Sequence, residues 1–142
     1  MRNQINILLV EDNEGDIMLT VEALRQAKVR KILKVVRDGA EAIAFLNKEG
    51  KYVNEATPDI VLLDINLPKL TGKDVLVKIK SDNALKKIPV VMLTTSSLEE
   101  DVLYSYSNYA NCYITKPVDI GKFMIIVQSL EYFWIATAEL PN

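Results

Sequence analysis

Three acidic side chains follow two apolar segments of the sequence, at the points where those segments end. Glu11 and Asp12 come directly after INILLV at 5–10, and Asp64 comes after DIVLL at 59–63. Apolar runs without alternation are typical of parallel strands buried on both faces, and ligands of such sheets bind beyond the carboxyl ends of the strands. If the two strands are neighbours, the three carboxylates lie together, and their mutual repulsion requires a cation.

The chain contains no histidine, which limits the chemistry that these acids can support. Catalytic triads with histidine and histidine-ligated metal sites are excluded, so any metal must be a hard ion held by oxygen ligands. Mg²⁺ is the natural choice, because it binds through one or two carboxylates and keeps waters that phosphate oxygens can replace. We therefore expect Mg²⁺ as the cofactor.

A hydroxyl group and a positive charge follow two further apolar segments. Thr94 comes after IPVVML at 88–93, and Lys116 follows the segment 111–115. A carboxylate, a metal ion, a hydroxyl donor and a lysine are the groups that form an aspartyl phosphate, a reaction that depends on positioning and charge neutralisation. The alternatives are helix-capping or turn roles for the acids and Thr94, and a solvated surface position for Lys116.

The segments between these residues alternate between strand and helix patterns. Strands are expected at 5–10, 32–36, 59–63, 88–93 and 111–115, and helices at 14–28, 40–46, 73–82, 98–109 and 119–137. Parallel strands need crossover connections, and right-handed crossovers place helices on both faces of the sheet. We predict a flavodoxin-like, doubly wound α/β sandwich of five βα units, with a parallel five-stranded sheet in the order 2-1-3-4-5. This order makes the first and third strands neighbours.

Helical spacing predicts which side chains of the first two helices face the core. They are Ile17, Val21 and Leu24 in the first helix, and Ala40, Ile43, Ala44 and Leu46 in the second. The polar segment 47–58 is interpreted as a surface insertion or a frayed helix end.

Composition and charge favour one compact domain. The 142 residues, 49% of them apolar, suffice for one good core but not for two. The net charge is −2, so the chain lacks the excess of basic residues that nucleic-acid binding requires. No apolar run reaches the ~18 residues of a membrane helix, and the start of the chain lacks the pattern of a signal peptide. We expect a cytoplasmic protein that binds neither nucleic acid nor membrane.

Four motifs resemble those of the receiver domains of two-component response regulators. They are LLVEDN at 8–13, LLDINLPKLTG at 62–72, PVVMLTT at 89–95 and YITKP at 113–117. The motifs occur in the family's order, each at the end of a predicted strand, and the resemblance covers about residues 4–136. It implies that 1–142 form a single receiver domain, with a short tail at 137–142 and no effector domain.

The resemblance also implies how the acids act. Asp64 matches the phosphoacceptor and Asp12 a direct Mg²⁺ ligand. Glu11 matches a second acid that usually acts through water. Asn66 matches the position whose backbone carbonyl completes the metal site.

The same resemblance implies roles for four further residues. Thr94 matches the hydroxyl that moves to the phosphoryl oxygen, and Lys116 matches its lysine partner. Tyr113 matches an aromatic rotamer switch, although an aromatic residue in a strand is also common as plain packing. Pro117 matches a proline that usually follows a cis peptide bond.

The function that the resemblance implies is phosphoryl transfer from a phosphohistidine of a sensor kinase. Since this chain has no histidine, the donor would be another protein or a small acyl phosphate. The segment 47–58, with LPKLTG and FWIATAELP, resembles single-domain regulators associated with phytochrome-type histidine kinases. Such a protein is a signalling switch that catalyses only its own phosphorylation and dephosphorylation, and its output passes through its own surface.

The last predicted helix is apolar nearly all round. One stripe and the angles beside it carry Phe123, Met124, Ile125, Ile126, Val127, Leu130, Tyr132, Trp134 and Ile135. A surface helix buries only one stripe, so the surplus predicts a second contact. We expect a homodimer through the fourth helix, fifth strand and fifth helix. The alternative is that the C-terminal tail folds back over these side chains.

Three other functions compete with this interpretation. A haloacid-dehalogenase-like phosphohydrolase also uses an aspartyl nucleophile with Mg²⁺, but it needs a second Asp where this chain has Asn66. An interaction module that is never phosphorylated would not need the complete set of acids, hydroxyl and lysine. A flavin-binding protein would need a phosphate-cradling first loop, and none is recognisable.

Overall fold

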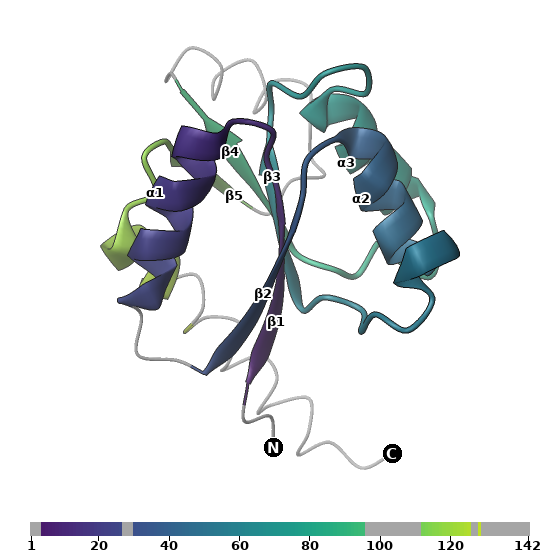
Figure 1. Cartoon of the computed structure of the whole chain (residues 1–142), viewed down its shortest axis with the longest axis horizontal. Coiled ribbons are helices and arrows are strands. Elements are labelled where there is room, and N and C mark those ends of the chain that lie inside the picture. The colour runs from purple at the N-terminus through teal and green to yellow at the C-terminus, as the bar shows by residue number, and fades with distance from the viewer. Residues whose placement is uncertain (1–3, 27–29, 96–111, 126–127, 129–142) are drawn as a thin grey trace.

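The described residues of the computed structural model, 4–26, 30–95, 112–125 and 128, contain one sheet of five parallel strands (Figure 1). The strands are β1 (Ile5–Val10), β2 (Lys31–Val36), β3 (Ile60–Asp64), β4 (Val90–Thr94) and β5 (Cys112–Thr115). Their order is β2-β1-β3-β4-β5, and every neighbouring pair is parallel. The predicted α/β fold and strand order are confirmed.

Helices cover both faces of this sheet. They are α1 (Glu14–Arg25), α2 (Gly39–Leu46) and α3 (Gly72–Ser81). Figure 1 shows α1 and the helical residues 120–125 on one side of the sheet, and α2 and α3 on the other. The predicted helix at 98–109 and most of the one at 119–137 lie outside the described residues, and so does most of the expected dimer face.

Strand β3 lies at the centre of the core, and all five of its residues are buried. Its side chains alternate between two apolar clusters: Val61 and Leu63 pack on the α2 and α3 side, and Ile60 and Leu62 pack on the α1 side. The strand ends with Asp64, one residue later than the sequence pattern indicates. Asp64 is therefore held by the sheet itself.

The first helix largely follows its predicted face. Asn13 caps α1 by accepting a hydrogen bond from the Asp16 N–H at 2.9 Å. Ile17 and Leu24 are buried as predicted, Thr20 joins them, and Val21 is only half-buried.

The predicted inward face of α2 is confirmed for Leu46, which is buried, and for Ile43, which packs against the core, but not for Ala40 and Ala44. Ala40 is exposed, and Ile43 and Ala44 are half-buried. The buried residues are Gly39, Ala42, Phe45 and Leu46. Burying the aromatic ring of Phe45 removes far more apolar surface from water than burying the methyl group of Ala44, so the helix turns its Phe45 side to the core.

The segment 47–58 is attached to α2 through a tyrosine. It contains a short 3-10 helix, η1 (Gly50–Tyr52). The Tyr52 ring lies 5.3 Å from the ring of Phe45, centroid to centroid, and its hydroxyl donates a hydrogen bond to Glu41 at 2.8 Å. The segment is therefore an ordered surface insertion and not a frayed helix end.

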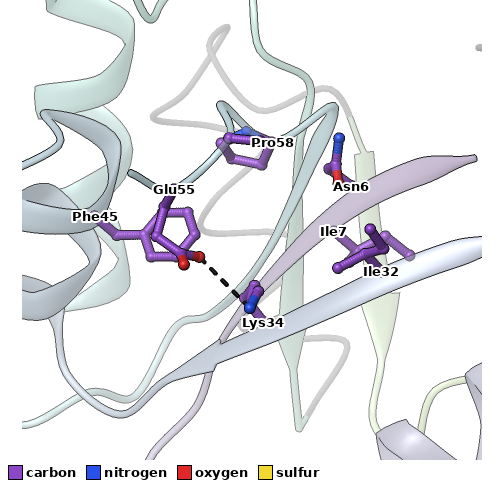
Figure 2. A pocket seen from close by; sticks show the side chains of 8 residues that line it. Asn6, Ile7, Ile32, Lys34, Phe45, Glu55 and Pro58 are labelled. Carbon is purple, nitrogen blue, oxygen red and sulfur yellow. Dashed lines mark ion pairs between the residues drawn. The ribbon is translucent and has the colours of Figure 1, made fainter. Parts of the chain in front are cut away.

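The same insertion closes a hollow beside the amino ends of β1 and β2 (Figure 2). An ion pair of 3.7 Å between Lys34 and Glu55 crosses it, and Asn6 and Pro58 form part of its wall. Its volume of about 30 Å³ suits one or a few water molecules and no larger ligand. Any larger ligand must bind elsewhere.

None of the described helices combines the length and the apolar composition needed to cross a membrane.

Candidate metal and anion site

The three acids lie together at the carboxyl edge of the sheet. Val10 and Leu63 are paired in register, so Glu11 and Asp64 extend from neighbouring strands. One carboxylate oxygen from each of Glu11, Asp12 and Asp64 lies within 4.8 Å of the other two. Glu11 and Asp64 are only 0% and 2% exposed, while Asp12 is exposed to solvent.

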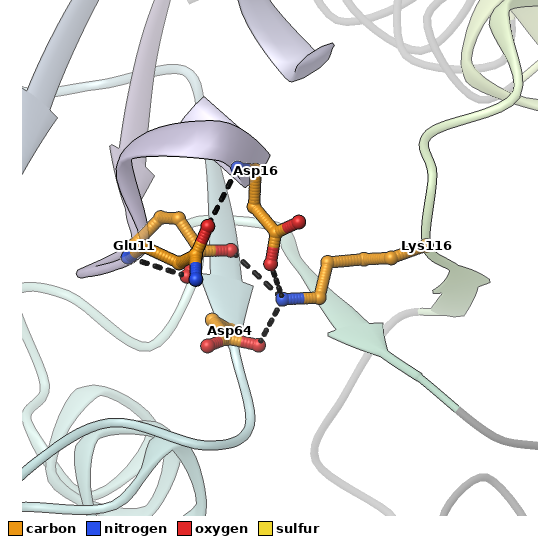
Figure 3. Close-up of polar contacts among 5 residues, drawn as sticks. Glu11, Asp16, Asp64 and Lys116 are labelled. Carbon is orange, nitrogen blue, oxygen red and sulfur yellow. Dashed lines mark hydrogen bonds and ion pairs between the residues drawn. The ribbon is translucent and has the colours of Figure 1, made fainter. Parts of the chain in front are cut away.

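The ammonium group of Lys116 lies among three carboxylates (Figure 3). The distances from Nζ are 2.8 Å to Asp16 Oδ2, 3.0 Å to Glu11 Oε1 and 3.1 Å to Asp64 Oδ1. The lysine side chain is 9% exposed. Its backbone N–H donates a hydrogen bond to the Thr94 carbonyl at 2.6 Å, which fixes the start of the side chain beside β4.

Burial and the neighbouring groups shift the pKa values of Glu11 and Lys116. Burial raises the pKa of Glu11 to about 7, with the charge of Asp64 adding to the shift and the hydrogen bond from Lys116 opposing it. For Lys116, burial lowers the pKa, but the carboxylates of Asp16, Glu11 and Asp64 outweigh it, so that the pKa lies above its usual value. The lysine is therefore charged at neutral pH.

The environment of Asp64 fits a divalent cation. Although Lys116 lies 3.1 Å from Asp64 Oδ1, this ion pair does not meet hydrogen-bond geometry, and the oxygen accepts no hydrogen bond within the described residues. A buried carboxylate oxygen without such a bond is costly, and a metal ion would satisfy it. The donor set consists of carboxylate oxygens, which suits Mg²⁺ or Mn²⁺. Glu11, Asp12 and Asp64 are thus the residues that could hold the ion.

Thr94 and Tyr113 lie on the neighbouring strands β4 and β5. Thr94 is the last residue of β4 and is buried. It follows the alternation of Met92, which packs with the α2 and α3 cluster, as does Tyr113. Met92 is paired with Tyr113 in register, and Thr94 with Thr115. The hydroxyl residue and the aromatic residue therefore share a face, two strand positions apart.

The loop between β3 and α3 returns very close to Asp64. A side chain at Gly72 would place its Cβ 2.3 Å from the Asp64 carbonyl oxygen and 2.7 Å from the Ile65 Cα. The Gly72 N–H donates to the Ile65 carbonyl at 3.1 Å, and Thr71 caps the helix. Asn66 is exposed within this loop, two residues after Asp64.

The peptide bond that follows Lys116, between Lys116 and Pro117, is cis, as the resemblance implies.

Sequence reasoning missed one residue of this site, Asp16. The pattern places Asp16 on the solvent side of α1, yet of the three carboxylates it lies nearest to the Lys116 ammonium group, at 2.8 Å. The signal was its position in the first turn of a helix that starts directly after the two acids. Because α1 begins at the carboxyl edge of the sheet, a side chain in its first turn lies near the acids at that edge.

Comparison with known proteins places the chain among signalling proteins. Residues 7–128 match the family model described as response regulator receiver domain. The chain is 46% identical over 135 residues to the response regulator Rcp1 of Synechocystis sp., a match that covers 95% of this chain and 92% of Rcp1.

Solved structures of similar sequence share the fold. The phosphorylated cyanobacterial phytochrome response regulator RcpA is 50% identical, with a TM-score of 0.74 over 98% of this chain and 99% of that one. The bacteriophytochrome response regulator AtBRR is 41% identical, with a TM-score of 0.85 over 99% of both chains. The Mn²⁺-bound form of Rcp1 has a TM-score of 0.72 at 45% identity, over 97% of this chain and 99% of that one.

Proposed function

This chain belongs to the response regulator receiver domain family, and from that premise we propose that it is a stand-alone response regulator phosphorylated on Asp64 in a Mg²⁺-dependent reaction. The observation that carries the proposal is the meeting of Glu11, Asp12 and Asp64 beside Lys116 at one edge of the sheet. The relative RcpA, solved in its phosphorylated form, supports it.

In the proposed reaction Asp64 is the nucleophile. A carboxylate oxygen of Asp64 attacks the phosphorus of the donor, and the bond from phosphorus to the leaving group breaks as the new P–O bond forms. The leaving group, a histidine nitrogen of a kinase or the carboxylate of an acyl phosphate, keeps the electron pair. Bound Mg²⁺ would offset the charge of the carboxylates and of the phosphoryl oxygens.

The groups that hold the ion would be Glu11, Asp12, Asp64 and the backbone carbonyl of Asn66. The first three converge within 4.8 Å, and Asn66 lies two residues past Asp64 on the adjoining loop. We assign Mg²⁺ as the resident ion because its octahedral, oxygen-rich coordination leaves room for waters and a phosphoryl oxygen.

The switch would work through the residues around the new phosphoryl group. Lys116, already 3.1 Å from Asp64 Oδ1, would pair with a phosphoryl oxygen. The Thr94 hydroxyl would donate a hydrogen bond to another phosphoryl oxygen. The ring of Tyr113, on the same face as Thr94, would then change its rotamer. This face would have two arrangements, and the phosphoryl charge would favour one of them. The change between the two would be the signal.

We assign the phosphoryl donor to a sensor histidine kinase of the phytochrome type. The relative RcpA is a phytochrome response regulator and AtBRR a bacteriophytochrome response regulator. The chain has no histidine of its own to phosphorylate, so the donor must be another molecule. In this proposal residues 1–142 act as one receiver domain in the cytoplasm. The domain passes the signal to its target through its own surface.

Phosphorylation by a small donor tests the proposal. The protein is incubated with Mg²⁺ and acetyl phosphate, and the intact mass is measured. We expect one phosphoryl group on the wild type and none on Asp64→Asn. Asp59→Asn is the matched control, because Asp59 is a second buried acid beside the opposite end of the same strand and should not affect phosphorylation.

Two results would overturn the proposal. One is a wild-type protein that binds Mg²⁺ but forms no adduct, which would favour a receiver-like interaction module. The other is an adduct that persists in Asp64→Asn.

A further inference from the structure

Asp16 contacts the site without belonging to the group of acids that could hold a metal. Its Oδ2 lies 2.8 Å from Lys116 Nζ, and its side chain is 33% exposed. Its backbone N–H is fixed by the Asn13 cap at 2.9 Å, so the first turn of α1 holds the residue at the edge of the crevice. Asp16 is therefore a fixed negative charge beside the lysine.

Lys116 and a metal ion would compete for the same two carboxylates, those of Glu11 and Asp64. The lysine contacts Glu11 Oε1 at 3.0 Å and Asp64 Oδ1 at 3.1 Å, and both residues are in the acidic cluster. A divalent cation repels an ammonium group and attracts the carboxylates that now surround it. Binding of the cation therefore requires Lys116 to loosen these two contacts.

The third contact of Lys116 need not be lost, because Asp16 lies outside the cluster. We propose that Asp16 is a positioning residue that retains Lys116 at the edge of the site when a divalent cation binds Glu11 and Asp64, and so strengthens binding of that cation. The inference rests on the proposed function only in taking Mg²⁺ as the ion. Asp16 stabilises Lys116 more in the metal-bound state, where it is the main partner of the lysine. In the metal-free state three carboxylates contact the lysine, and the contribution of Asp16 is smaller.

Calorimetric titration with Mg²⁺ tests the inference on the full chain. We expect Asp16→Asn to bind Mg²⁺ about fivefold more weakly than the wild type, the size expected for a partly exposed, charge-assisted hydrogen bond. Glu14→Gln is the matched control: it removes another charge from the first turn of α1, but from an ion pair with Arg37 at 2.7 Å. The control should stay within about twofold of the wild type, since exposed pairs contribute little.

The same titration in a Lys116→Met background separates positioning from simple attraction. Without the lysine to hold, Asp16→Asn should no longer weaken Mg²⁺ binding, and the difference is read from the double-mutant cycle. Asp16→Glu, which keeps the charge, should restore part of the affinity.

Thermal unfolding in EDTA verifies that each variant is folded. Variants with Lys116→Met should unfold at a lower temperature, because they lack the cation that lies among three carboxylates.

Two outcomes would overturn the inference and leave the proposed function standing. One is an Asp16→Asn variant with wild-type Mg²⁺ affinity. The other is an equal loss with and without Lys116, because Asp16 would then act on the ion directly. A wild type that binds no Mg²⁺ is a different result, and it would overturn the proposed function itself.

Discussion

Glu11 is a fully buried acid of the site, and burial raises its pKa. The pKa of its carboxyl rises from 4.5 to about 7, first because of burial and then because of Asp64. Lys116 reduces this shift without cancelling it. At neutral pH the residue is thus poised between its neutral form and the ionised form that a metal ion favours.

The first prediction concerns how stability depends on pH. Because the folded-state pKa of Glu11 is raised, its contribution to stability is fully present below about pH 4.5, and it is lost as pH rises through about 7. In EDTA we expect the free energy of unfolding of the wild type, relative to Glu11→Gln, to fall between about pH 5 and about pH 8. Urea denaturation at a series of pH values measures it. A difference that does not change over this range would contradict the assigned pKa.

At the scale of the elements, the ends of the strands could be predicted and the inward sides of the helices only in part. The apolar runs of β1 and β3 stop at charged residues, so the sequence itself marks where Glu11 and Asp64 emerge. The face of α2 depends on how Phe45 packs against other elements, which local spacing does not contain. The contact of Asp16 depends on the reach of a lysine 100 residues away.

A second prediction concerns the turn that joins β3 to α3. In Gly72→Ala the new Cβ would meet the Asp64 carbonyl oxygen at 2.3 Å, so the loop must move. We expect a loss of about 2 kcal/mol or more in unfolding free energy, as for overpacked sites, together with weaker Mg²⁺ binding. Urea denaturation and calorimetry measure the two effects.

The matched control for this variant is a second glycine near the start of a helix. A Cβ at Gly15, in the first turn of α1, would meet only the Asn13 side chain, at 3.2 Å. Since the Asn13 side chain need shift by only a few tenths of an ångström, Gly15→Ala should change the unfolding free energy by less than about 1 kcal/mol in either direction. If both variants lose stability equally, the close approach at Gly72 is not the cause.

At the scale of the whole molecule, the strand order creates the site. Glu11 and Lys116 are 105 residues apart in sequence and extend from β1 and β5, which are separated by β3 and β4. Their side chains nevertheless meet at the carboxyl edge, where Lys116 Nζ lies 3.0 Å from Glu11 Oε1 (Figure 3). A sheet with another order would contain the same residues and no site.

A third prediction concerns assembly. The apolar surplus of residues 119–137 in the sequence predicts a homodimer through the fourth helix, fifth strand and fifth helix. We expect light scattering to show a dimer, measured with and without beryllofluoride, which mimics the phosphoryl group. Asp64→Asn, which cannot form the mimic, is the control. A monomer at high concentration in both states would contradict the predicted dimer.

The position of the phosphoryl group is the most direct test of the central claim. Acyl phosphates are reduced by borohydride, so the phosphorylated residue can be trapped as an alcohol and located by peptide mass spectrometry. After treatment with Mg²⁺ and acetyl phosphate, we predict that position 64 is converted to homoserine, and that omission of Mg²⁺ prevents it. Reduction at Asp12, at Glu11 or at no residue of a Mg²⁺-bound protein would contradict the account.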